Sequence, residues 1–443
     1  MRLLALFLLA ATPLAQGPRI QISHTTESLR GVSAVSQNVA WASGTHGTYL
    51  RTINAGATWT PAQVPDAANL DFRAVVAFSA DEAFLMSSGP GDQSRIYHTT
   101  DGGQHWQLQF TNTNPKGFYD SMAFWDPKHG IALGDPVPDD SGKLKFELLI
   151  TDDGQTWHPI PPSQLPPALE GEGAFAASNS CIAILHNTPV AVALTPQIKA
   201  APAAPLDRIV IPSEARDLGF AEAIPAPGGP TQPSPLSWQT GDSASRELAT
   251  NPAASAAEGD SNIWFATGGK TSRVFHSPDR GQTWQVFDTP IIRGPDSAGI
   301  FSIAFRDPLH GAIAGGDYKR PKADGPNLAF TSDGGKTWTL SDITPQAYFS
   351  AVAYDAKFEA DAVHQQAAQE KQESAGKKIR MKPVPPQRLF IIGPDFIFDF
   401  RPPLNPRHIG GKKKEGYAFN AVSPLPEGGA LIVGPKGTIA YIP

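Results

Sequence analysis

A short phrase ending in tryptophan recurs five times in this chain and constrains its fold more than any other feature. The copies, TINAGATW, TTDGGQHW, ITDDGQTW, SPDRGQTW and TSDGGKTW, end at Trp59, Trp106, Trp157, Trp284 and Trp338. A glycine stands three residues before each tryptophan, and an amide or carboxylate stands five before it, at Asn54, Asp101, Asp152, Asp279 and Asp333. The short side chain can accept backbone N–H bonds, glycine permits a tight turn, and tryptophan can bury the turn against a neighbouring strand. Each phrase therefore predicts a self-stabilised turn between two β-strands.

The pattern Ser/Thr-x-Asp-x-Gly-x-x-Trp resembles the Asp-box of sialidase-type and related β-propellers. Successive tryptophans are 47, 51, 127 and 54 residues apart. Three of these intervals suit one four-stranded blade per repeat, and the long one requires an insertion. The sequence thus predicts an all-β propeller in which the five Asp-box turns are structural and lie far apart on the outer rim.

A second phrase, an apolar strand followed by a strand that ends in glycine, occurs seven times and predicts seven blades. The copies begin at residues 31, 73, 121, 173, 301, 348 and 419, and the last two lack the Asp turn. The final copy has only three strands of its own, whereas RIQISHT at 19–25 is an additional strand near the N-terminus. We therefore expect one propeller domain over 19–443, in which the N-terminal strand closes the last blade and leaves no open sheet edge.

Two insertions interrupt this domain. Residues 188–260 are rich in Pro, Ala and Ser and cannot bury enough apolar surface to offset their ordering entropy, so we expect them to be disordered. Residues 356–387 are rich in Ala, Glu, Gln and Lys, which predicts a charged, solvated helix. Both lie between the first two strands of their blades, so we expect both on one face of the disc.

Composition and the first residues indicate an exported protein. Residues 1–15, MRLLALFLLAATPLA, predict a secretory signal peptide cleaved after Ala15. The single cysteine, Cys181, allows no internal disulfide and lies in an apolar strand, which is typical of an unreactive core thiol. We expect a monomer in the bacterial periplasm or an extracellular setting. The net charge of −6 argues against a nucleic-acid partner, and no apolar run after the leader is long enough to span a membrane.

The motifs of cofactor and metal chemistry are missing from the sequence. It contains no GxGxxG after a strand, no GxxxxGK[ST], no HExxH and no GxSxG. The eleven histidines show no ligand spacing, and two of them, His129 and His310, occupy equivalent DPxHG turns, which indicates a structural role. We therefore expect no cofactor, no metal and no complete catalytic set.

Polar residues gather where propellers usually bind ligands, around the central channel on the face with the loops before the first strand and after the second strand of each blade. The candidate binding residues are Arg30, His46, Arg73, Asp120, Asp135, Glu172 and Asp317. Because arginine offers a rigid fork to carboxylates, this group predicts an anion or glycan site. Two alternatives stay open: Arg73 and Asp120 can neutralise each other across adjacent blades, and Asp135 and Asp317 can share a turn role.

With phrases such as GVSAVSQNVAWASG…TINAGATW and SIAFRDPLHGAIAGGD…TSDGGKTW, the chain resembles the BNR-repeat (WD40/YVTN-like) seven-bladed propellers related to the photosystem II stability and assembly factor. The likeness covers most of the chain outside the two insertions. It implies a secreted or lumenal scaffold that binds a protein partner. We therefore expect binding of a protein partner or an anionic ligand without turnover.

The rival hypothesis is a sialidase-like glycoside hydrolase acting on exported or extracellular glycans. Such enzymes share the Asp-boxes but require an arginine triad, a Tyr/Glu pair and an Asp acid/base, and LRGV at 29–32 matches their Arg-Ile-Pro phrase poorly. Retaining glycosidases also need two carboxyl groups about 5 Å apart. Glu172 and Asp120 are the candidates for such a pair.

Overall fold

The computed structural model describes residues 17–185, 261–341, 347–357, 388–394, 396–400, 407–410 and 419–443. Nearly all regular structure in these ranges is β-strand, with two single-turn 3-10 helices at Gly91–Gln93 and Pro162–Gln164. The leader at 1–15, the insertion at 188–260 and most of the insertion at 356–387 lie outside the described residues. The expectations for these three segments therefore remain predictions.

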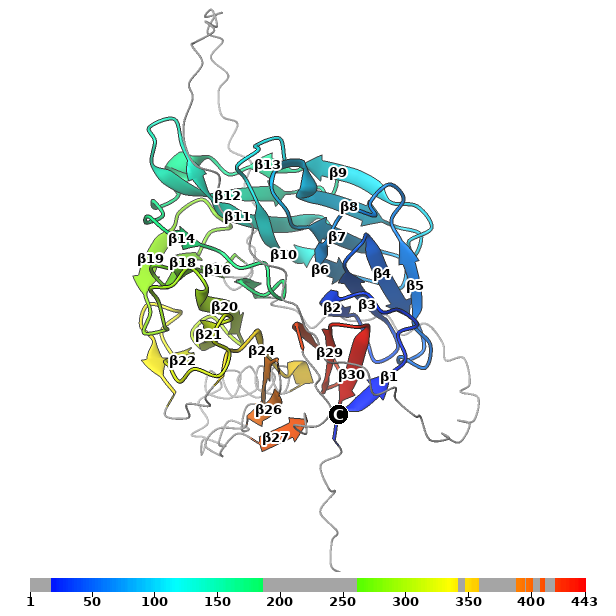
Figure 1. The fold of residues 1–443 in the computed structure, drawn as a ribbon. Helices are drawn as coiled ribbons and strands as arrows, with labels where there is room; N and C mark the ends of the chain where they lie inside the picture. The colour runs from blue at the N-terminus through cyan, green and yellow to red at the C-terminus, as the bar shows by residue number, and fades with distance from the viewer. Residues whose placement is uncertain are drawn as a thin grey trace, which may run out of the picture. The chain divides into compact units, whose positions relative to one another are not determined.

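The strands form seven antiparallel blades in chain order (Figure 1). Blades 1 to 3 are β2 (Leu29–Ala34), β3 (Ala40–Gly44), β4 (Thr48–Thr52) and β5 (Thr60–Gln63); β6 (Phe72–Ala77), β7 (Ala83–Ser87), β8 (Arg95–Thr99) and β9 (Gln107–Thr111); and β10 (Tyr119–Asp126), β11 (His129–Pro138), β12 (Leu144–Thr151) and β13 (His158–Pro159). Blades 4 and 5 are β15 (Ile182–Ile184), β16 (Ile263–Ala266), β18 (Arg273–Ser277) and β19 (Gln285–Asp288); and β20 (Ala298–Phe305), β21 (Gly311–Asp317), β22 (Leu328–Thr331) and β23 (Thr339–Leu340). Blades 6 and 7 are β24 (Ala351–Tyr354), β25 (Leu389–Gly393), β26 (Phe396–Phe400) and β27 (Arg407–Gly410); and β28 (Ala421–Pro424), β29 (Ala430–Gly434), β30 (Thr438–Ile442) and β1 (Arg19–Gln21).

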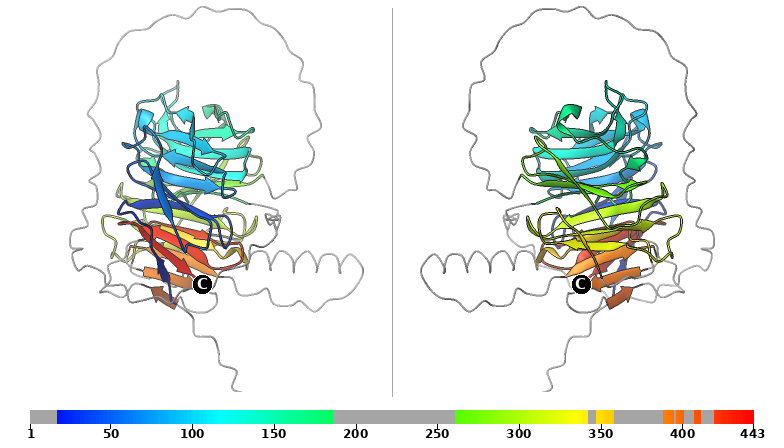
Figure 2. Two further views of the ribbon diagram at one scale, coloured as in Figure 1. Left: turned by 90° about the vertical axis from the view of Figure 1, so that its right-hand side faces the viewer. Right: turned by 90° about the vertical axis from the view of Figure 1, so that its left-hand side faces the viewer.

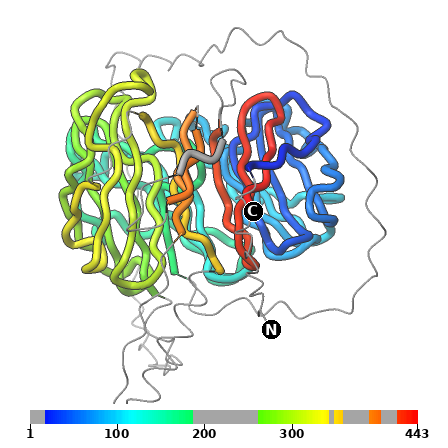
Figure 3. The backbone as a smooth tube through the Cα atoms, turned by 90° about the horizontal axis from the view of Figure 1, so that it is seen from below, coloured from blue at the N-terminus to red at the C-terminus, as the bar shows by residue number. Residues whose placement is uncertain are grey.

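The ring closes through the two ends of the described chain. The first strands of the blades contact one another in the cyclic order β2, β6, β10, β15, β20, β24, β28 and back to β2. The N-terminal strand β1 pairs with β30, with Arg19 opposite Tyr441 and Gln21 opposite Ile439, so the C-terminal strand lies beside the first described strand (Figure 3). The prediction of a seven-bladed propeller closed by its N-terminal strand is confirmed, although β1 is shorter than the expected 19–25.

Blade 5 carries two extra short strands, one from the segment before β15 and one from the connection between β16 and β18 of blade 4. β14 (Glu172–Gly173) pairs with β17 (Gly268–Gly269), which pairs with β20 through Gly268 and Gly299. A Cβ on Gly299 would lie 2.3 Å from the Cα of Gly268, and Gly299 has a φ of +153°. Only glycine permits this close approach, which holds blades 4 and 5 together on one side of the ring.

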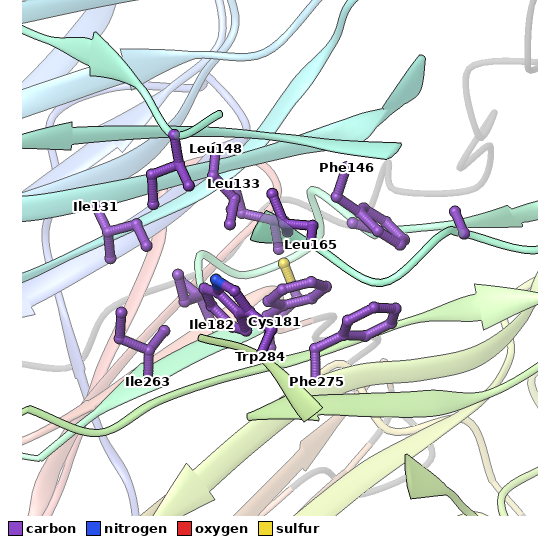
Figure 4. Close-up of a cluster of buried hydrophobic side chains, with 14 residues drawn as sticks. Ile131, Leu133, Phe146, Leu148, Leu165, Cys181, Ile182, Ile263, Phe275 and Trp284 are labelled. Atoms are coloured by element: carbon purple, nitrogen blue, oxygen red, sulfur yellow. The ribbon is translucent and has the colours of Figure 1, made fainter. Parts of the chain in front are cut away.

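Each interface between neighbouring blades in the described part of the chain contains its own cluster of buried apolar side chains. Figure 4 shows the cluster between blades 3 and 4, where Phe146, Cys181 and Trp284 lie among aliphatic residues. Cys181 is fully buried, and burial strongly raises the pKa of its thiol. The side views in Figure 2 show blades 1 and 2 in front from one side and blades 4 and 5 from the other. The core is therefore distributed around the ring between the blades.

The five turn tryptophans lie in these interfaces. Each contributes to the cluster between its own blade and the preceding one: Trp59, Trp106, Trp157, Trp284 and Trp338. Trp59 also donates from Nε1 to Oε1 of Gln21 at 2.8 Å, and Gln21 Nε2 donates to the carbonyl of Ala55 at 3.1 Å. The first turn of the chain therefore binds the strand that closes the ring.

Side chains in these turns accept hydrogen bonds from their own backbone. In blades 1, 2, 4 and 5 a hydroxyl accepts the N–H of the turn glycine, and an amide or carboxylate oxygen accepts the N–H four residues later. These pairs are Thr52 with Asn54, Thr99 with Asp101, Ser277 with Asp279 and Thr331 with Asp333. Because each acceptor serves its own turn, the side chain stabilises the local hairpin.

The turn of blade 3 departs from the sequence alignment. The N–H groups of Gln155 and Thr156 donate to Oδ1 of Asp153 at 2.7 and 2.8 Å, so Asp153 takes the place that the sequence assigned to Asp152. Thr151 stands six residues before its tryptophan, whereas the threonine of blade 2 stands seven before, so this turn is one residue shorter. The spacing from the threonine, and not from the tryptophan, identifies the acceptor.

Substitution of Asp333 tests the structural role of these turns. Its carboxylate accepts from Thr337 N at 2.9 Å, Thr337 Oγ1 at 2.6 Å and Thr331 Oγ1 at 2.8 Å. We expect Asp333→Ala to lower the free energy of unfolding by about 1 to 3 kcal/mol in a denaturant titration, because these donors lose their acceptor. Asp333→Asn is the matched control, since Asn54 serves the same turn in blade 1, and it should lose much less. Equal losses in the two variants would contradict this role.

Candidate functional site

Two arginines share one carboxylate at the start of blades 1 and 2. Arg30 and Arg73 are each the second residue of the innermost strand, in β2 and β6, so the fold brings them to the same end of neighbouring strands. Arg73 Nε donates to Asp71 Oδ2 at 2.9 Å, and Arg30 Nε lies 3.4 Å from Asp71 Oδ1. Both guanidinium side chains are about 30% exposed. Since two cations share a single anion, this group carries one surplus positive charge.

Aromatic side chains from other blades adjoin the two arginines. Tyr348 enters from the start of blade 6, where burial raises the pKa of its phenol and the charge of Arg30 opposes that shift. The ring of Phe301 is 4.8 Å from that of Tyr348 and stacks on Phe175 at 3.9 Å. Arg73 Nη1 donates to the carbonyl of Ala176, next to Phe175, at 3.3 Å. We refer to Arg30, Asp71, Arg73, Phe175 and Tyr348 as the channel mouth.

The buried Asp120 lies near Arg73, and the half-buried Asp135 lies near Asp120. Asp120 is 2% exposed and its Oδ2 has no hydrogen-bond partner, and burial together with the nearby Asp135 raises its pKa well above the ordinary range. Burial raises the pKa of Asp135 to about 6, although its Oδ1 accepts the N–H of Ala174 at 2.9 Å. Arg73 makes its ion pair with Asp71 and only lowers the pKa of Asp120 from a distance. The Asp71 pair thus takes the place of the suggested neutralisation of Arg73 by Asp120.

Glu172 belongs to a separate, internally satisfied group. Its oxygens accept from Arg273 Nε at 2.9 Å and Nη2 at 2.5 Å, from Thr267 Oγ1 at 2.7 Å and from Leu169 N at 2.8 Å. The carboxylate is fully buried, and its ion pair connects β14 to β18. A carboxylate with all of these contacts is committed to joining β14 to blade 4 and has no acceptor capacity left for a ligand.

Asp317 and His46 are held by their own loops. Asp317 accepts from Ser297 Oγ and Arg320 Nε, both at 2.7 Å, and from Lys319 N at 3.0 Å, which fixes the turn after β21. His46 Nδ1 lies 2.7 Å from Glu27 Oε2, and this contact raises the pKa of the imidazole. His46 also lies near enough to Asp71 for that charge to raise its pKa further, so it borders the channel mouth.

The structure therefore brings together Arg30, Arg73, Asp120 and Asp135, places His46 beside them, and holds Glu172 and Asp317 in local networks. Sequence reasoning missed Asp71, Phe175, Tyr348 and Arg273. For Asp71 a signal existed, because it stands two residues before Arg73 and an extended chain points residues i and i+2 to the same side. For the other three, the contacts join blades that are distant in the sequence.

Within the described ranges, no group of three His, Cys, Asp or Glu side chains is arranged to hold a metal ion. The histidines of the two DPxHG turns each bond through Nδ1 to the aspartate of their own turn, Asp126 and Asp307, at 2.8 to 2.9 Å. A search of the same residues for a helix with the length and apolarity to cross a membrane finds none.

Comparison with solved structures returns β-propellers. YCF48 from Cyanidioschyzon merolae is similar at a TM-score of 0.50 and 14% identity, over 96% of this chain and 98% of that one. The GH74 xyloglucanase from Xanthomonas campestris is similar at 0.50 and 12%, over 96% of this chain and 53% of that one. U3-55K is similar at 0.50 and 8%, over 97% and 99%. No family model matches the chain, and no curated protein matches it. At these identities the likeness concerns the fold alone, and it confirms at that level the resemblance to the assembly-factor propellers: the chain is a seven-bladed β-propeller.

Proposed function

We propose that this protein is an exported propeller scaffold that binds a protein partner or another anionic ligand at the channel mouth without turning it over. The observation that carries the proposal is the surplus positive charge of Arg30 and Arg73, which share Asp71 and remain about 30% exposed. Guanidinium groups that are partly desolvated and held in place bind carboxylates strongly. Phe175 and Tyr348 add an apolar surface next to that charge, which suits a protein ligand.

The test is capture of a partner by purified protein in a periplasmic or secreted extract, followed by affinity measurement with the identified partner. We expect Arg30→Ala/Arg73→Ala to weaken binding by at least tenfold, a loss of about 1.4 kcal/mol or more. Arg51→Ala/Arg95→Ala is the matched control, because these arginines lie in blades 1 and 2 with similar exposure and carboxylate partners. Equal loss in both double variants, or none in either, would contradict the proposed site.

Glycan hydrolysis is the second candidate, and the observation that favours it is the pair formed by the buried Asp120 and the half-buried Asp135. Two neighbouring carboxyl groups with raised pKa values can keep a proton for general acid catalysis. Glu172 does not suit this role, because Arg273 neutralises it. The test exposes the protein to fluorogenic glycosides, sialosides included. Turnover that disappears in Asp120→Asn would replace the scaffold proposal with an enzyme, whereas no turnover supports the scaffold.

A further inference from the structure

The segment that leads into blade 4 lies inside the ring. Residues 174–180 stand between β14 and β15, and their side chains bond to the innermost strands of both neighbouring blades. In blade 3, Met122 N donates to Asn179 Oδ1 at 2.8 Å. In blade 5, Ser180 Oγ donates to Ser302 Oγ at 2.8 Å. We refer to residues 174–180 as the plug.

The plug also reaches the blades beyond these neighbours. Ser178 Oγ donates to the carbonyl of Ser350 at 2.9 Å, directly before the first strand of blade 6. On the other side, Arg73 Nη1 in the first strand of blade 2 donates to the carbonyl of Ala176 at 3.3 Å. Because blades 2 and 6 lie on opposite sides of blade 4, one short segment contacts both only where it runs across the central channel. The plug therefore closes the channel at the channel mouth.

The plug fixes one end of a guanidinium group in the channel mouth. Arg73 is held at Nε by Asp71 at 2.9 Å and at Nη1 by the carbonyl of Ala176. A guanidinium has five N–H donors in a rigid plane, so two fixed bonds set its orientation and still leave donors for a carboxylate. Arg30 shares Asp71 and has a similar exposure, but within the described ranges it makes no hydrogen bond to the plug. The plug therefore orients one of the two arginines.

We propose that the plug positions Arg73 for its ligand, so that closure of the plug and binding at the channel mouth stabilise each other. This inference rests on the function proposed for the channel mouth and adds the element that holds the site in its binding geometry. An arginine that is already oriented loses less side-chain entropy when the ligand binds. By linkage, a ligand that prefers the closed plug also holds the plug closed by the same factor. Ala176 and Asn179 act through Arg73 and are positioning residues.

The first experiment needs no ligand and measures hydrogen–deuterium exchange of the full chain by mass spectrometry. We expect Arg73→Ala to raise the rate of deuterium uptake in residues 174–181 about fivefold or more, because the plug loses a hydrogen bond from a charged group. Arg30→Ala is the matched control and should leave this rate at the wild-type value. Uptake in residues 40–52, which contain β3 and β4, should stay unchanged in both variants and excludes global unfolding. Equal uptake of the plug in the two variants would overturn the proposal.

The second experiment adds 4-fluorobenzoate, a carboxylate with one aromatic ring, at concentrations that saturate the protein in a fluorine NMR titration. We expect this probe to slow deuterium uptake in the plug of the wild type about fivefold or more and to leave uptake in Arg73→Ala unchanged. Binding of the probe without protection of the plug would overturn the linkage and leave the proposed function standing. Absence of saturable binding to the wild type would overturn both.

Asn179→Gly loosens the plug without changing either arginine. Asn179 has a φ of +56°, which glycine adopts readily, so this variant removes the acceptor for the donors of blade 3 and keeps the backbone conformation. Uptake in the plug should rise, and the probe should lower it again. Ser423→Ala is the matched control, because Ser423 Oγ accepts the N–H of Ala34 at 2.9 Å and joins blades 7 and 1 instead. Equal uptake of the plug in these two variants would contradict the closed plug and overturn the proposal.

Discussion

Replacement of Arg388 by alanine is expected to lower the free energy of unfolding by about 3 to 5 kcal/mol, because it removes the guanidinium group that is paired with two buried carboxylates. Arg388 Nη1 lies 3.1 Å from Asp355 Oδ2, and its Nε lies 3.1 Å from Asp399 Oδ1. The three side chains are 8%, 1% and 4% exposed. Nη2 also donates to the carbonyl of Pro443 at 2.7 Å, so the guanidinium fastens the C-terminal residue of blade 7 to blade 6.

Denaturant titration of wild type, Arg388→Ala and Arg95→Ala measures this effect. Arg95 is the control, because its partner Asp92 is 3.9 Å away and 76% exposed, and exposed pairs contribute about 1 kcal/mol or less. Arg388→Lys should fall between the two, since a point charge cannot reach both carboxylates and the carbonyl as a planar fork does. A loss in Arg388→Ala as small as that in Arg95→Ala would mean that Asp355 and Asp399 find other partners.

The fold was predictable because each blade repeats the same local chemistry. Turn phrases such as TSDGGKTW contain the hydroxyl, the carboxylate and the glycine that bond within one hairpin, so their meaning does not depend on distant residues. The missing fourth strand of the last copy likewise predicted the pairing of β1 with β30. The prediction from the repeat was wrong where a copy differs in length: in the shorter turn of blade 3, Asp153 and not Asp152 is the hydrogen-bond acceptor.

The candidate site was only partly predictable, because its contacts join residues that are distant in the sequence. The position of Arg30 and Arg73 follows from strand alternation and the blade repeat. The partner of Glu172 does not: Arg273 lies 101 residues further along the chain, beyond the long insertion. Tyr348, at the start of blade 6, lies near enough to Arg30 in blade 1 for the two groups to affect each other's pKa. Such pairs decide which carboxylates are neutralised. The sequence therefore predicted which residues lie near one another at the candidate site, but it did not predict their ion-pair partners.

The carboxyl groups of Asp120 and Asp135 make stability depend on pH. Burial raises the pKa of Asp135 to about 6, and the charge of Glu147 adds to that shift, whereas the N–H of Ala174 opposes it. In the unfolded chain an aspartate titrates near pH 3.9. The folded protein therefore binds more protons than the unfolded chain between about pH 4 and 6, so the free energy of unfolding falls as the pH rises through this window. Burial and the nearby Asp135 raise the pKa of Asp120 as well, so its ionisation changes the free energy of unfolding in the same direction.

Asp135→Asn is expected to remove this dependence, because the amide keeps the acceptor for Ala174 N and carries no charge. A difference of about 2 pH units corresponds to about 3 kcal/mol, so the variant should be more stable than the wild type by up to that amount at pH 8 and similar to it at pH 4.

Asp101→Asn provides a control of opposite sign. Bonds from the backbone and side chain of His105 lower the pKa of Asp101 to about 2, so its contribution is present above pH 4 and lost as the pH falls towards 2. This variant should be less stable than the wild type at neutral pH and should approach it in acid. Urea titrations of the three proteins from pH 3 to 8 measure both differences, and an Asp135→Asn curve parallel to that of the wild type would mean that Asp135 ionises at its ordinary pKa in the folded protein.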